Sequence, residues 1–67
     1  MNELVEAMWQ AIVSTTGIVV RTTDRTRLTS QFYRARRQVP EFEELTIKTM
    51  PGSATEMCII RKDNLNG

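Results

Sequence analysis

Apolar side chains near the N-terminus recur with the period of an α-helix. Asn2 can cap this helix, and the polar residues around Ser14 indicate its end. The apolar positions fall on one wide arc of a helical wheel, and they are Leu4, Val5, Met8, Trp9 and Ile12. The pattern therefore predicts a first helix with a broad buried side.

The next apolar stretch has no alternation. Ile18, Val19 and Val20 follow Gly17 as a continuous β-branched run. Such a run is typical of a strand that is covered on both faces. We expect this first strand over residues 17–22.

A second helix is predicted over residues 24–38. Its apolar positions are spaced four, three and four residues apart, and they are Leu28, Phe32, Ala35 and Val39. Pro40 ends the helix, because the residue before a proline avoids helical dihedral angles.

The C-terminal part alternates with a period of two. Leu45, Ile47 and Thr49 lie between polar neighbours, and a Pro-Gly-Ser turn follows at residues 51–53. A third strand is expected over residues 56–62, so that the two strands form a hairpin. Residues 40–44 are expected to be a solvated acidic linker.

The predicted fold class is α+β, with one small domain in the order α-β-α-β-β. A crossover through the second helix joins the first two strands, which predicts a three-stranded mixed sheet with the helices packed on it. The unbroken apolar runs indicate that the first and third strands are central or adjacent. The domain is expected to span residues 1–62, followed by a flexible polar tail at residues 63–67.

Two apolar strands create a problem for the second face of this sheet. Whichever parity points inward, apolar residues such as Val19, Cys58 and Ile60 point outward. One interpretation is an uncovered face that forms a dimer or partner interface, to which Trp9 could add a binding hot spot. The alternative is that the first helix covers this face and makes a three-layer domain.

The composition limits how the chain can be stabilised. It has 67 residues, one cysteine and no histidine. An intrachain disulfide is excluded, and so are the usual zinc sites of cysteine and histidine. A domain of this size is marginally stable by itself. We therefore expect a homo-oligomer, with a homodimer as the simplest form.

The same composition bears on where the protein works. A lone cysteine suits a reducing compartment. Glu3 and Glu6 replace the basic start of a signal peptide, and no apolar run is long enough to span a membrane. We expect a cytoplasmic protein that does not enter membranes.

The chain offers no evident catalytic machinery. General bases are commonly histidines, which are absent. Cys58 lies among apolar strand residues, where a thiol is a small packing group. The glycines form no phosphate-binding loop, and the glutamates at positions 41, 43 and 44 fit a solvated loop better than a metal site. We expect no catalytic residue, cofactor or metal.

The second helix is unusually rich in arginine. Its candidate partner-binding residues are Arg25, Arg27, Tyr33, Arg34, Arg36 and Arg37. Three interpretations remain: a solvated face partly neutralised by the nearby glutamates, a contact with an acidic protein surface, and a contact with a nucleic-acid backbone. The net charge of +1 does not favour nucleic acid by itself.

Several segments together suggest a type of protein. The strand at residues 17–22, the helix end Tyr33-Arg34-Ala35-Arg36-Arg37 and the strands at residues 45–48 and 57–62 resemble small uncharacterised proteins of tailed phages and prophages. The resemblance implies an accessory protein that binds and redirects or inhibits a host component, which would place it in the host cytoplasm. We expect a non-enzymatic binding module that contacts a protein, with nucleic-acid binding through the second helix as the alternative.

Overall fold

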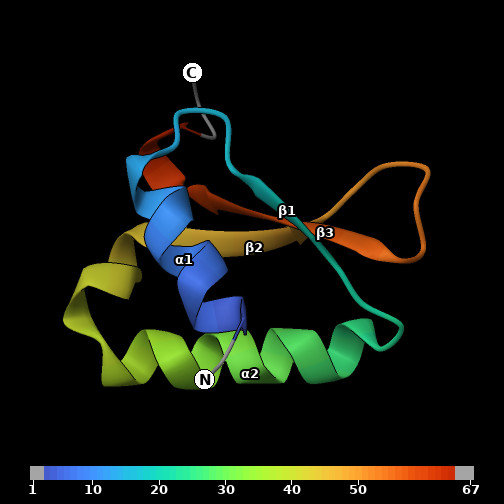
Figure 1. Ribbon diagram of the computed structural model, residues 1–67, viewed down its shortest axis with the longest axis horizontal. Coiled ribbons are helices and arrows are strands. Elements are labelled where there is room, and N and C mark those ends of the chain that lie inside the picture. The colour runs from blue at the N-terminus through green and yellow to red at the C-terminus, as the bar shows by residue number, and fades with distance from the viewer. Residues whose placement is uncertain (1–2, 65–67) are drawn as a thin grey trace.

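A computed structural model describes residues 3–64 of the chain (Figure 1). The elements in chain order are α1 (Glu3–Val13), β1 (Ile18–Arg21), α2 (Arg25–Gln38), the 3-10 helix η1 (Pro40–Glu44), β2 (Leu45–Thr49), β3 (Glu56–Arg61) and the 3-10 helix η2 (Lys62–Asn64). The α+β class and the order α-β-α-β-β are confirmed. The predicted cap at Asn2 lies outside the described residues.

The strand order in the sheet is β1-β3-β2, and β3 is antiparallel to both neighbours. The prediction of a mixed sheet is therefore wrong. β1 and β2 do run in the same direction, as the crossover predicts, but β3 lies between them. The central position fits the sequence of β3, because Met57 to Ile60 are apolar on both faces and all four are buried.

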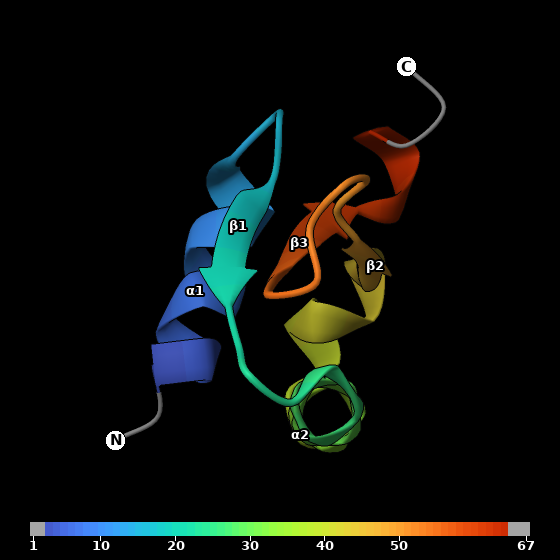
Figure 2. The same cartoon turned by 90° about the vertical axis from the view of Figure 1, so that its right-hand side faces the viewer.

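Both helices cover the same face of the sheet. The buried residues of α1 and α2 join one core with Met57 and Ile59 of β3 and with Leu45 at the start of β2. Figure 2 shows α2 end-on beneath the strands and α1 beside β1. Because α1 packs into the same core as α2, the domain has two layers, and the three-layer alternative is wrong.

The opposite face of the sheet is less open than the sequence suggests. Cys58 and Ile60 are buried there, whereas Val19, which pairs with Cys58, is 50% exposed. Gly17 explains part of this burial, because a Cβ at this position would lie 2.9 Å from Cys58 Sγ and 3.1 Å from Ile60 Cβ. The loop between α1 and β1 thus packs closely over the outer side of β3.

The acidic segment after α2 is folded rather than extended. Residues 40–44 form η1, which begins at a proline and places Phe42 in the core with no exposed surface. Its ring meets Trp9 of α1 edge to face, with centroids 4.7 Å apart. The three glutamates of η1 remain exposed, as expected of this segment.

The predicted tail begins inside an ordered turn. Residues 63 and 64 belong to η2, and the side chain of Asn64 donates to the carbonyl oxygen of Ser14 over 3.4 Å. Arg61 Nη2 lies 3.0 Å from Asp63 Oδ2 and 3.2 Å from Glu44 Oε1. These contacts attach η2 to the domain, and the flexible tail stays a prediction. Residues 65–67 of the predicted tail lie outside the described part of the chain.

Candidate functional site: the arginine face of helix α2

Local interactions set the position and rotation of α2. The Asp24 side chain accepts a hydrogen bond from the backbone N–H of Arg27 over 3.0 Å, which caps the first turn. The N–H of Val39 donates to the carbonyl oxygen of Ala35 at the other end, just before Pro40. Leu28 and Phe32 are buried, so the opposite side of the helix faces solvent.

The arginine face is the name we give to Arg25, Arg27, Tyr33, Arg34, Arg36 and Arg37. All of these side chains are exposed except that of Arg36, which is half-buried. The helix lies along the bottom of the molecule in Figure 1, with the sheet above it. The predicted side chains are therefore brought together on one accessible surface of a helix that is anchored by its other side.

The guanidinium groups of this face have no acidic partner among residues 3–64. Both ion pairs in this range involve Arg61, which lies on β3. Glu44 is one of its partners and does not reach α2. No glutamate of η1 therefore forms an ion pair with an arginine of α2 in this range, although Glu43 borders a hollow together with Tyr33, Arg36 and Arg37.

Arg36 differs from its neighbours because it holds α2 against η1. Its Nη2 lies 3.4 Å from the carbonyl oxygen of Glu43, and its guanidinium carbon lies 5.8 Å from the centroid of the Tyr33 ring. An arginine over an aromatic ring is stabilised by the negative face of the ring. We conclude that Arg36 and Tyr33 shape the arginine face, while Arg25, Arg27, Arg34 and Arg37 carry its free charge.

The four apolar candidates do not form one surface. Trp9 is 45% exposed and packs against Phe42. Val19 is half exposed on the outer side of the sheet, where Cys58 and Ile60 are buried. Cys58 and Ile60 therefore offer little area to a partner, and the accessible apolar groups are Trp9 and Val19.

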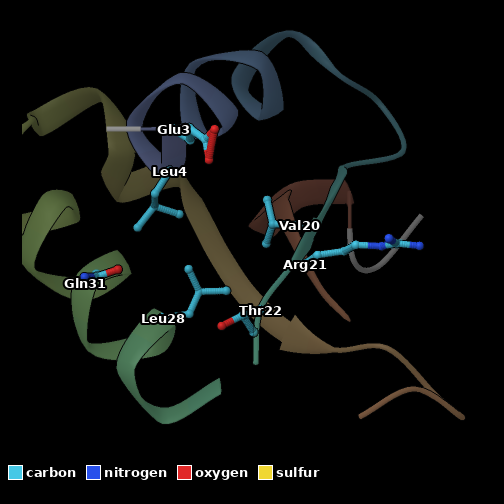
Figure 3. Close-up of a pocket in the computed structure, with 7 residues that line it drawn as sticks. All are labelled: Glu3, Leu4, Val20, Arg21, Thr22, Leu28 and Gln31. Carbon is cyan, nitrogen blue, oxygen red and sulfur yellow. The ribbon is translucent and has the colours of Figure 1, made fainter. Parts of the chain in front are cut away.

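A hollow beside β1 has no counterpart in the sequence predictions. It has a volume of about 930 Å³ and lies between the start of α1, the end of β1 and the first half of α2 (Figure 3). Its residues come from three consecutive elements, and the hollow depends on how these elements pack in space, which the sequence pattern does not give.

Residues 3–64 contain no cluster of three or more side chains that could hold a metal ion. No helix in this range is long and apolar enough to cross a membrane. Comparison of the chain with protein-family models, with curated proteins and with solved structures finds no match.

Proposed function

We propose that this protein is a small non-enzymatic binding module that docks the arginine face of α2 on an acidic surface of a partner protein. The observation that supports this most directly is the exposure of Arg25, Arg27, Arg34 and Arg37 without a carboxylate partner in the described residues. Such unpaired charges on a rigid helix are complementary to an acidic surface.

The choice of arginine fits this role. A guanidinium group is planar and can make two parallel hydrogen bonds to a carboxylate, which a lysine cannot do. The free arginines are spread over both shoulders and the outermost line of the helix. A broad acidic surface can engage such an arrangement, whereas a single small anion would contact only one or two of these groups.

The biological setting is proposed from the resemblance to small phage and prophage proteins. An accessory or inhibitor protein of this kind would act in the host cytoplasm, by occupying the surface of a host protein. Its small size suits this role, because it presents one helix on a minimal scaffold.

Charge reversal on the arginine face should abolish partner binding. We expect the double variant Arg34→Glu and Arg37→Glu to lose a protein that the wild-type chain retains from nuclease-treated bacterial lysate, because like charges then oppose the acidic partner. The matched control is Lys48→Glu with Lys62→Glu, which changes the net charge equally at two exposed residues outside α2. Equal retention by both double variants would contradict the proposal.

Nucleic-acid binding is the second candidate, since the same free guanidinium groups could contact phosphates. Binding to duplex DNA would weaken steeply with salt, with a log-log slope of about −0.9 for each phosphate neutralised. A gel-shift titration at low salt measures this slope. A complex that forms with DNA and is lost in the Arg34→Glu, Arg37→Glu variant would favour this function over protein docking.

A homodimer is proposed from the small size of the core and from the exposure of Trp9 and Val19. Light scattering across a concentration series should give twice the monomer mass. If Trp9 lies in the interface, Trp9→Ser should shift this mass towards the monomer. If Val19 lies there, Val19→Ser should do so. A constant monomer mass in the wild-type protein would contradict the proposal.

A further inference from the structure

The outer edge of β1 carries backbone groups that no strand in residues 3–64 satisfies. Within the described residues β1 is an edge strand, since β3 is its one neighbour there. The N–H of Thr22 donates to the carbonyl oxygen of Thr55 over 2.8 Å, so Thr22 faces β3. Backbone groups alternate in direction along an antiparallel strand. The backbone N–H and C=O groups of Val20 therefore also point towards β3. The N–H and C=O groups of Val19 and Arg21 point the other way, out from the edge of the sheet.

The hollow of about 930 Å³ adjoins this edge. Figure 3 shows the side chains of Leu4, Val20 and Leu28 around the same space, with Glu3 and Gln31 at its border. The apolar groups come from α1, β1 and α2. An edge with free backbone groups beside an apolar hollow is the arrangement that binds an extended peptide by strand addition.

Charge indicates what kind of peptide fits. Arg27 and Arg34 are four residues before and three residues after Gln31, so they lie on the side of α2 that borders the hollow. Arg21 extends away from the hollow (Figure 3), and its register partner on β3 is Glu56. Glu3 adds a carboxylate at the start of α1. Arg27 and Arg34 have no carboxylate partner in residues 3–64, so the α2 side of the hollow favours an acidic segment, whereas Glu3 and Glu6 of α1 lie on the other side.

We propose that β1 and this hollow bind an extended acidic segment of a partner protein, which adds to the sheet as a fourth strand and places one apolar side chain between Leu4, Val20 and Leu28. This deepens the proposed function and rests on it for the class of partner. Arg27 and Arg34 then lie beside the bound strand and attract its acidic side chains. Arg37 lies on the outermost line of α2, away from the strand.

Two other occupants fit the observations less well. A second copy of this chain paired through β1 would bring the arginines around both hollows towards each other, and like charges in such a contact are unfavourable. A nucleic acid can accept hydrogen bonds from the N–H groups of Val19 and Arg21, but it lacks the regular backbone donors that a peptide offers to their carbonyl oxygens. The alternation of donors and acceptors on the edge is matched by a peptide.

The first test uses a displayed library of short random peptides, selected on the immobilised wild-type protein. We expect the enriched peptides to combine acidic residues, β-branched residues and one larger apolar residue. Hydrogen exchange at the amides of Val19 and Arg21 should slow when a selected synthetic peptide is bound. Enrichment without an acidic and apolar bias, or unchanged exchange at both amides, would overturn the proposal.

The second test removes one outward donor from the edge. Val19→Pro deletes an N–H that does not bond to β3, and edge strands tolerate proline at such positions. Losing one peptide hydrogen bond should weaken binding of the selected peptide about tenfold, whereas Val19→Ala keeps the donor and should bind within a few fold of wild type. A peptide methylated at alternate backbone nitrogens tests the same bonds without changing the protein. Full affinity of the methylated peptides in both alternating registers would overturn strand addition.

Charge variants distinguish binding at the edge of β1 and its hollow from binding at the arginine face as a whole. Arg27→Glu should weaken the selected peptide about tenfold or more, and Arg37→Glu, the matched control, should change its affinity by less than about twofold, given the screening of exposed charges. If Arg37→Glu abolishes capture of the partner protein but no peptide binds at the edge of β1, the peptide-binding proposal is contradicted while the proposed function stands. If peptides bind at the edge but charge reversal on α2 does not change partner capture, the peptide site stands and the proposed function fails. A wild-type dimer that Val19→Pro dissociates, or DNA that displaces the selected peptide from the edge, would assign the edge to another occupant.

Discussion

Replacing Phe32 with alanine is expected to cost about 3–5 kcal/mol of unfolding free energy, the range found for truncating a buried aromatic side chain. The Phe32 ring has no exposed surface, and it belongs to the core that joins α2 to the sheet. A single small core supplies about 3–5 kcal/mol in total, so the variant should be largely unfolded at room temperature. Circular dichroism during urea and thermal unfolding measures the loss.

The neighbouring aromatic residue provides the control. Tyr33 is 41% exposed and touches Phe32 edge to face, with ring centroids 5.2 Å apart. Tyr33→Ala should therefore cost clearly less than Phe32→Ala, because much of the Tyr33 ring already contacts water. A melting temperature close to wild type for Phe32→Ala would show that the rotation of α2 is incorrect, and the arginine face would then not exist as described.

Substitution of Gly17 by alanine should be the second severe change. Gly17 has φ of +89°, a conformation that costs an L-residue about 1–2 kcal/mol. An added Cβ would also lie 2.9 Å from Cys58 Sγ and 3.0 Å from the carbonyl oxygen of Ile59. Overpacking of this kind typically adds about 1–3 kcal/mol, which gives a total of about 2–5 kcal/mol. Urea unfolding of the variant measures this sum.

Gly52 separates the two causes. It has a similar φ of +78°, but nothing lies within 4 Å of its added Cβ. Gly52→Ala should therefore show the backbone cost alone, about 1–2 kcal/mol. Adding Cys58→Ala to Gly17→Ala removes the Sγ contact but not the contact with the backbone of Ile59, so a double-mutant cycle should show partial compensation. Equal losses at the two glycines would mean that the loop does not pack on β3 as described.

The helices were predictable because their signals are local. The spacing of Leu28, Phe32 and Ala35 is contained in a few turns, and Pro40 marks the end of α2 within two residues. The same local pattern places the arginines opposite the core. Phe42 was the exception, since a single apolar residue among glutamates gives no periodicity, and only the packing of η1 against α1 and α2 shows why it is buried.

Strand arrangement was harder to predict, because pairing joins residues that are distant in the chain. The apolar runs correctly indicated that β1 and β3 are central or adjacent, and the crossover that β1 and β2 run in the same direction, but neither placed β3 between the other two strands. The two-sided apolar pattern of β3 had two possible explanations. The structure shows a third arrangement, in which α1 and α2 share one face and the loop at Gly17 packs closely over Cys58 on the other.

The amino-acid sequence by itself determined the elements, the buried side of α2 and the lack of a histidine or a second cysteine, because these depend on residue identity and short-range periodicity. Only the tertiary structure decided that four arginines of α2 have no acidic partner in residues 3–64, that Cys58 and Ile60 are covered, and that the edge of β1 borders a hollow. Ion pairing, burial and edge exposure depend on which distant segments meet in space, and local patterns do not contain that information.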